Sequence, residues 1–176
     1  MVLPNPIKNR GEKERGSRRG RPQLDRADKE FDQVIIDLAR VTRVTKGGKR
    51  MRFRACVVIG DRKGRVGFGV AKGADVTGAV NKAVRQARKS ILTVRLVNET
   101  IPGRLIAKYG AAELLLKPAP RGSGIIAGGA AREVLALAGV PNVVSKSLGG
   151  KNKINNVKAV FVALERLNRM MPRFRI

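Results

Sequence analysis

The densest run of side chains that could do chemistry lies between residues 40 and 65, where ten Lys and Arg residues accompany one acid, Asp61. Within it Arg50, Arg52 and Arg54 recur at every second position, with apolar residues between them. In a β-strand this spacing puts the three guanidinium groups on one face and the apolar side chains on the other. Because the planar guanidinium fork matches two phosphate oxygens at once, the pattern predicts a strand face that binds a polyanion.

The segment just before this strand has the features of a hairpin turn. Lys46-Gly47-Gly48-Lys49 separates it from an earlier strand-like run, and glycine adopts the positive φ that tight turns need without strain. The turn is itself basic. We therefore expect a β-hairpin whose tip and one face carry positive charge.

A second candidate is the glycine-rich run at 120–129, PRGSGIIAGG, which leads into a predicted helix. Such loops can cradle phosphate because free backbone N–H groups and the helix dipole point at it. The run is not a P-loop, since no Gly-Lys-Ser/Thr follows, and no acid is placed about 20 residues on to bind a ribose. We favour a phosphate-backbone or protein contact, with an RNA-modifying or nucleotide-using enzyme as the alternative.

The overall charge restricts the partners. The chain of 176 residues has 38 Lys and Arg against 13 Asp and Glu, a formal net charge of +25, with 43% hydrophobic residues. That composition fits a globular protein whose charge is neutralised by a partner, and nucleic acid is the leading one. A membrane surface is the rival, but no apolar run approaches the roughly 18 residues of a membrane span. A general nucleoid protein is a weaker possibility.

Catalytic and metal-binding groups are scarce. Cys56 is the single cysteine and the chain has no His, which removes the commonest general base and the commonest metal ligand. We expect Cys56 to be an inert, partly buried thiol, and we expect no metal and no cofactor. The N-terminus lacks the apolar stretch of a signal peptide, so the expected location is cytoplasmic.

Composition divides the chain into four parts, and the predicted class is α+β. Residues 1–30 are basic and poor in apolar residues, which predicts a flexible, disordered arm. Residues 31–91 predict a β-β-β-α unit like a double-stranded-RNA-binding module without its first helix. Residues 92–168 predict a small two-layer α/β unit of order β-β-α-β-α, and residues 169–176 a short basic tail.

The predicted elements follow from periodicity and from turn residues. Strands are expected at 31–44, 50–59, 65–72, 92–97, 111–118 and 143–148, and helices at 76–90, 130–138 and 153–167. Asp75 is the expected N-cap of the first helix. Gly139 and Pro141 are expected to end the second helix. One face of the third strand is nearly bare at Gly67 and Gly69, which indicates either close approach by another backbone or an RNA sugar, or else a bulge or tight packing within the sheet.

Four ordered motifs resemble the family of bacterial small-subunit ribosomal protein five. They are VTRVTKGGKR at 41–50, VVIGDRKGRVGFG at 57–69, GSGIIAGGAAREVL at 122–135 with AGVPNV at 138–143, and KSLGGKN at 146–152 with NNVKA at 155–159. The resemblance spans roughly residues 31–167. It implies a non-catalytic constituent of the small subunit, located in the ribosome.

The resemblance also implies partners and sites. It implies binding to small-subunit ribosomal RNA and contact with small-subunit proteins four and eight. It implies a place beside the path by which messenger RNA enters, a part in subunit assembly and decoding accuracy, and no small-molecule substrate, with a spectinomycin site near the basic loop at 45–49. The expected RNA-binding residues are Arg40, Arg43, Thr45, Lys46, Gly47, Gly48, Lys49, Arg50, Arg52, Arg54, Arg62, Lys63, Arg65 and Lys72. The residues expected at a protein interface or on backbone phosphate are Arg121, Gly122, Ser123, Gly124, Gly128, Gly129 and Arg132.

Overall fold

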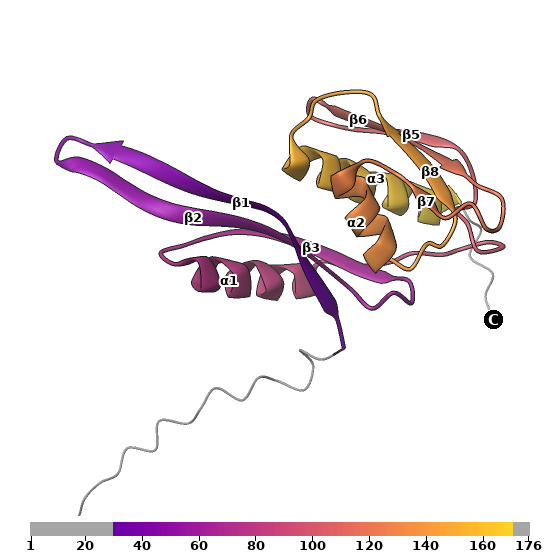
Figure 1. Cartoon of the computed structure of the whole chain (residues 1–176), viewed down its shortest axis with the longest axis horizontal. Helices are drawn as coiled ribbons and strands as arrows, with labels where there is room; N and C mark the ends of the chain where they lie inside the picture. The colour runs from indigo at the N-terminus through magenta and orange to yellow at the C-terminus, as the bar shows by residue number, and fades with distance from the viewer. Residues whose placement is uncertain (1–29, 171–176) are drawn as a thin grey trace, which may run out of the picture.

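The computed structural model describes residues 30–170, which form two four-stranded sheets and their covering helices (Figure 1). The first sheet has the strand order β1-β2-β3-β4, with every neighbouring pair antiparallel. Its elements are β1 (Asp32–Thr45), β2 (Gly48–Gly60), β3 (Arg65–Gly73), β4 (Ile91–Thr93) and the helix α1 (Val76–Lys89). The β1–β2 hairpin extends well beyond the end of α1 (Figure 1).

The second sheet has the order β5-β6-β8-β7, and only the β7–β8 pair is parallel. Its elements are β5 (Leu105–Tyr109), β6 (Ala112–Pro118), β7 (Ile125–Ile126), α2 (Gly129–Leu137), β8 (Val143–Ser147) and α3 (Lys153–Met170). Both helices lie on one side of this sheet, the side turned toward the first unit (Figure 1). The predicted fold class, a β-β-β-α unit followed by a two-layer α/β unit, is confirmed.

One strand assignment was wrong. The strand predicted at 92–97 was placed in the second unit, but β4 pairs with β3 in the first sheet, where Leu92 lies opposite Val66. The N–H of Val94 continues this pairing by donating to the carbonyl of Gly64 (2.6 Å), and the Val94 side chain enters the core. The strand that the second unit needs is β5, which was not predicted from the sequence, and neither was the two-residue β7.

The glycines of β3 are explained by α1. A Cβ added to Gly67 would lie 2.5 Å from the carbonyl oxygen of Ala87, and one added to Gly69 would overlap that of Ala83. The helix backbone therefore lies directly on the strand, and its alanines face the glycines. Of the two explanations open from the sequence, close approach by another backbone holds, and that backbone is the chain's own.

Helix ends largely follow the expected signals. Asp75 occupies the N-cap of α1 with extended backbone, although its side chain makes no capping hydrogen bond. Gly139 has a φ of 74° just after α2, and the N–H groups of Gly139 and Val140 donate to the carbonyls of Ala136 and Leu135, as in a Schellman motif. At the start of α3 it is Asn152 that caps, its Oδ1 accepting from the N–H of Ile154 (3.0 Å).

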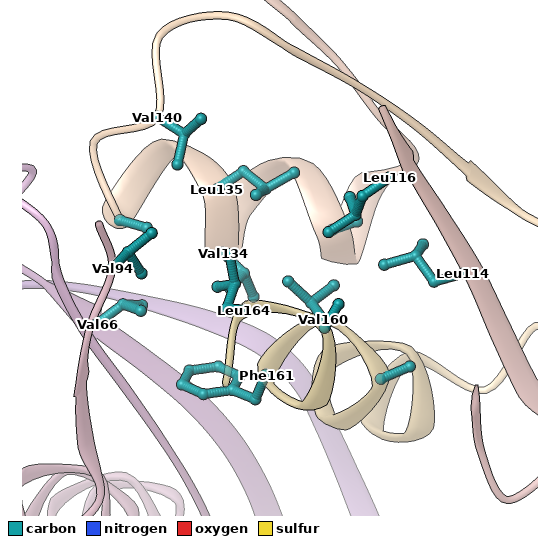
Figure 2. Packing of buried hydrophobic residues seen from close by; sticks show 14 of the residues in the cluster. Val66, Val94, Leu114, Leu116, Val134, Leu135, Val140, Val160, Phe161 and Leu164 are labelled. Carbon is teal, nitrogen blue, oxygen red and sulfur yellow. The ribbon is translucent and has the colours of Figure 1, made fainter. Parts of the chain in front are cut away.

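The two units share one hydrophobic core. Val66 and Val94 pack in the same cluster as Val134 and Leu135 of α2 and Phe161 of α3 (Figure 2). The ring of Phe68 on β3 lies 4.5 Å, centroid to centroid, from that of Phe161. A smaller cluster lies between α1 and the first sheet, built on Ala55, Val57, Ile59 and the α1 alanines. Because burial of apolar area drives folding, a shared core fixes the orientation of one unit against the other.

Two expectations fall wholly or partly outside the described residues. The arm predicted over 1–30 lies outside them except for Glu30, and so do residues 171–176 of the predicted tail. The start of that tail was placed too early, because α3 continues as a helix through Met170. No helix among residues 30–170 is long and apolar enough to cross a membrane.

Candidate nucleic-acid interface

The basic ladder predicted from the sequence forms one face of the β1–β2 hairpin. In the antiparallel register, Arg50 lies opposite Arg43, Arg52 opposite Val41, and Arg54 opposite Ala39. Directly opposite residues in a pair of strands share a face. Lys72 of β3 lies opposite Arg54 and so joins the same face.

The other face of β2 belongs to α1. Ala55, Val57 and Ile59 are buried beneath the helix, and Phe53 is half-buried against the same cluster. This is the division that the alternation from Arg50 onward predicted. Closer to the tip, where α1 no longer covers the sheet, Met51 is 56% exposed.

Four cations meet in a groove on the ladder face. The groove has a volume of about 300 Å³ and is lined by Val41, Thr42, Arg43, Arg50, Arg52 and Lys72. The four basic side chains are exposed, and none has an ion-pair partner among residues 30–170. Like charges directly opposite each other destabilise a strand pair, so the contact of Arg43 with Arg50 costs free energy until an anion enters. The geometry suits a phosphate backbone, in which successive negative charges lie a few ångströms apart.

The hairpin tip is open. The hydroxyl of Thr45 donates to the carbonyl of Gly48 (3.0 Å), and Gly48 has a φ of 140°, as the glycine turn predicted. A Cβ at Gly47 or Gly48 would have nothing within 4 Å. Lys46 and Lys49 are exposed beside them, so a partner can approach the backbone at the tip closely.

Not every predicted residue lies on this face. Arg40 is opposite Phe53, and Lys49 is opposite Val44, so both belong to the reverse side of the hairpin. Arg40 is exposed.

Three predicted RNA-binding arginines are paired within the protein. Arg54 lies 3.2 Å from Asp37, Arg62 lies 2.9 Å from Asp32, and Arg65 lies 2.6 Å from Asp61. Asp37 also faces Lys153 of α3 at 4.0 Å. Asp37 and Asp32 lie far from Arg54 and Arg62 in the chain, so these two pairs could not be predicted from the sequence, whereas Asp61 lies only four residues before Arg65. The ladder is therefore unpaired at its outer end and neutralised at its inner end.

The β2–β3 turn is built around Asp61 and braces the two units. Burial opposes the charge of Asp61, but hydrogen bonds from the Arg65 side chain and from the N–H groups of Arg65 and Lys63 outweigh it and hold the pKa of Asp61 below its ordinary value. Arg62 has a left-handed φ of 56°, and its N–H donates to the carbonyl of Leu137 at the end of α2 (3.0 Å). Lys63 remains exposed at the tip of this turn.

Tight packing reinforces this contact between the β2–β3 turn and α2. A Cβ on Gly60 would overlap the carbonyl oxygen of Leu137, and one on Gly139 would overlap that of Arg62. The turn's main role in the described structure is thus to hold α2. The glycine that ends α2 also makes room for the neighbouring unit.

Cys56 follows Arg54 on the same face of β2, at the inner end of the ladder. Its side chain is buried, and desolvation, followed by the nearby Asp37 carboxylate, raises the pKa of the thiol to about 11. A thiol with so little thiolate at neutral pH is a poor nucleophile. Among residues 30–170 no group of three or more His, Cys, Asp or Glu side chains is arranged to hold a metal ion.

The glycine-rich run lies in the second unit, away from the hairpin tip (Figure 1). Gly122 and Gly124 adopt left-handed φ values of 86° and 70°, and the N–H of Gly124 donates to Asn142 Oδ1 (3.2 Å). Ser123 is half-buried, and exposed Arg121 lies 3.7 Å from Glu99.

The run ends at α2 in an exposed surface. Gly128 is the N-cap, no side chain caps the helix, and Arg132 is exposed on its first turn. A Cβ added at Gly122, Gly124, Gly128 or Gly129 would have nothing within 4 Å, so these glycines do not accommodate the chain's own packing. A groove of about 290 Å³ adjoins Gly128 and Gly129 and is also lined by Lys151 and Lys153, which were not among the predicted site residues. The feature of the sequence that could have identified these two lysines is their position just after the Gly149-Gly150 turn.

The fold and its surfaces define a class: a two-unit α+β protein with a cationic hairpin on a double-stranded-RNA-binding-like sheet. Two family models match the chain, described as "Ribosomal protein S5, N-terminal domain" over residues 31–95 and "Ribosomal protein S5, C-terminal domain" over residues 107–172. The chain belongs to the ribosomal protein S5 family. This is a family of structural ribosomal proteins and not of enzymes, so the nucleotide-using enzyme considered from the sequence is set aside.

Curated relatives agree. The chain is 51% identical over 136 residues to "Small ribosomal subunit protein uS5c" of Spinacia oleracea, which covers 77% of this chain and 44% of the relative. It is 51% identical over 142 residues to "Small ribosomal subunit protein uS5" of Gloeobacter violaceus, which covers 80% of this chain and 64% of the relative. The aligned part of the chain thus spans about half to two-thirds of the length of these relatives.

Proposed function

We propose that this chain is a structural, RNA-binding constituent of the small ribosomal subunit. Its unpaired hairpin cations bind small-subunit ribosomal RNA, and its second unit contacts neighbouring ribosomal proteins. In that setting it contributes to subunit assembly, borders the path by which messenger RNA enters and supports decoding accuracy. The name of the family and the names of both relatives support this assignment.

The observation that carries the proposal is the groove lined by Arg43, Arg50, Arg52 and Lys72. Four exposed cations without acidic partners among the described residues converge there. With one Tyr, five Phe and no Trp in the chain, base stacking is a minor contribution. Recognition therefore rests on the sugar–phosphate backbone and on RNA shape, and bound counterions are released when the complex forms.

The remaining family sites are assigned to two surfaces. The hairpin tip at 45–49 is open enough for close RNA contact. A spectinomycin site is expected beside it, so substitutions at the tip should alter sensitivity to spectinomycin. The glycine-rich run at 122–129 with Arg132 is the expected contact with small-subunit protein four, because its glycines leave backbone exposed for a protein surface. Protein eight is the second expected neighbour.

The test combines a substitution with a gradient. In the triple variant Arg43→Gln, Arg50→Gln and Arg52→Gln, we expect weaker binding to small-subunit ribosomal RNA and a flatter salt dependence. The slope of log K against log salt should shrink by about 2–3, since each lost phosphate contact removes roughly 0.7–0.9. On a sucrose gradient, less of the variant should travel with the small subunit than of the unaltered chain.

The matched control removes the same charge elsewhere. The control variant is Lys82→Gln, Arg85→Gln and Lys89→Gln. These three residues lie on the exposed side of α1, and glutamine is as good a helix former as lysine. We expect the control to retain more of the salt slope than the hairpin variant. Equal losses in both variants would mean that net charge, and not the groove, determines binding. Equal competition by duplex DNA and duplex RNA would instead favour a general nucleoid protein.

A further inference from the structure

The second sheet has one face that no described element covers. Its helices pack on the inner face, where Ala107, Leu114 and Leu116 are buried. Figure 1 shows α2 and α3 on that side only. The alternation of strands then places a different set of side chains on the opposite side, which we call the outer face. It comprises Ile106, Lys108, Glu113, Leu115, Lys117, Ile126, Val144, Lys146 and Leu148.

The outer face is apolar at its centre. Ile106 lies opposite Leu115 on the neighbouring strand, and Val144 lies opposite Ile126. Leu148 follows β8 and continues the ladder, since its N–H donates to the carbonyl of Glu113 (2.8 Å). Ile106, Ile126 and Leu148 are 44%, 54% and 54% exposed, and Leu115 and Val144 are half-buried. A contiguous exposed apolar surface of this kind indicates an interaction site.

Three lysines lie among these apolar residues. Lys108, Lys117 and Lys146 occur one to each strand of the antiparallel part of the sheet, and all are exposed. None has an ion-pair partner among the described residues. Glu113, opposite Lys108, is the one acid on this face, so the surface carries a net positive charge.

We propose that the outer face of the second sheet docks an acidic protein surface with an apolar centre. Protein interfaces have an apolar core and a polar rim, and complementary charges set their orientation. The inference rests on the proposed function, because the partner is a neighbouring protein in the small subunit. It adds a contact surface that is turned away from the helices and is distinct from the α2 N-terminus.

Other occupants fit the chemistry less well. A second copy of this chain would bring lysines against lysines, because a two-fold interface pairs each patch with itself. An RNA backbone would lie over isoleucine and leucine side chains, which cannot replace the water lost from its phosphates. The face has neither an arginine for bidentate phosphate contact nor an aromatic ring for stacking.

The test uses native small subunits that contain the full chain. Carbodiimide joins a lysine amine to a carboxylate that is in direct contact with it, and mass spectrometry identifies the two peptides. We expect Lys108, Lys117 or Lys146 to be joined to Asp or Glu residues of one neighbouring protein. We also expect these lysines to lose their reactivity toward an acetylating reagent on passing from the free chain to the subunit.

Three results would overturn the proposal in different ways. Equal acetylation in the free chain and the subunit would show that the face remains open to solvent. Protection in a complex with ribosomal RNA alone would make RNA the occupant. Absence of the chain from the small subunit would overturn the proposed function itself, which is a distinguishable failure.

Variants separate the apolar contribution from the charge. Ile106→Thr, Ile126→Thr and Leu148→Thr together should abolish the cross-links, whereas Ile35→Thr with Leu38→Thr should leave them unchanged. The control residues are 49% and 45% exposed on β1, so the substitutions are similar in burial as well as in chemistry. The acetylation comparison needs no substitution, and it therefore decides the question even if the triple variant folds poorly.

Discussion

Replacing Gly67 by alanine tests the contact that gives the first unit its shape. Gly67 lies on β3 beneath α1, and its Cα–H side faces the carbonyl oxygen of Ala87. The substitution adds one methyl group and changes nothing else. Because the obstructing atom belongs to helix backbone, it cannot rotate away as a flexible side chain would.

The cost follows from the separation. The added Cβ would lie 2.5 Å from that oxygen, while ordinary contact begins at 3.4 Å, so the strand and helix must part by about 0.9 Å. Overpacking of this kind costs about 1–3 kcal/mol, and the rigid partner favours the upper part of that range. Alanine also lowers the conformational entropy of the unfolded chain, which offsets about 0.4–1 kcal/mol of this cost. The expected net loss is roughly 2 kcal/mol, or about 4–8 °C in Tm for a chain of this size.

Thermal unfolding followed by circular dichroism measures this loss, and Gly78→Ala is the control. Gly78 lies on α1, where an added Cβ has nothing within 4 Å, so alanine should stabilise the helix by about 0.5–1 kcal/mol and raise Tm. The two substitutions are chemically identical and should shift Tm in opposite directions. An unchanged or higher Tm for Gly67→Ala would refute the close contact between α1 and β3.

Three further predictions concern the contact between the β2–β3 turn and α2, and the buried thiol of Cys56. Gly139→Ala should cost at least about 1–2 kcal/mol in urea unfolding, because alanine resists the left-handed φ and would overlap Arg62. Cys56 should react with a thiol reagent only on unfolding. Since its folded pKa is raised, stability should fall as pH rises from 9.0 toward about 11, and Cys56→Ala should lack that fall. Asp61→Asn should lower stability at pH 7; because the folded pKa of Asp61 is lowered, the difference from the unaltered chain should close as pH falls below 3.8.

Patterns with a strict period could be predicted from the sequence. The alternation from Arg50 to Ile59 fixed which side chains face α1, because in a strand adjacent residues point to opposite faces. The glycine turn at 47–48 and the end of α2 at Gly139 were also predictable, since few residues accept positive φ.

Assignments that depend on distant parts of the chain could not be predicted. Alternation identifies a strand but not its sheet, so the strand beginning near Leu92 was assigned to the wrong unit. β7 was missed because two residues in a glycine-rich run have no period, and it is a strand only through its pairing with β8. The candidate site shows the same limit, because composition cannot tell that Arg54 is paired with Asp37 while Arg52 is not.

The placement of the acids explains how one small unit can be both stable and strongly cationic. Residues 31–91 contain fifteen Lys and Arg but only four Asp. Three of these acids are paired with arginines at the inner end of the hairpin and at the β2–β3 turn, where the two units meet and repulsion would open the shared core. The outer end, around Arg50 and Arg52, receives no acid from the described residues. Repulsion among these outer cations is relieved only when an external anion binds. The base of the hairpin is thus stabilised by ion pairs within the chain, whereas the charge of its outer end is neutralised by the binding partner.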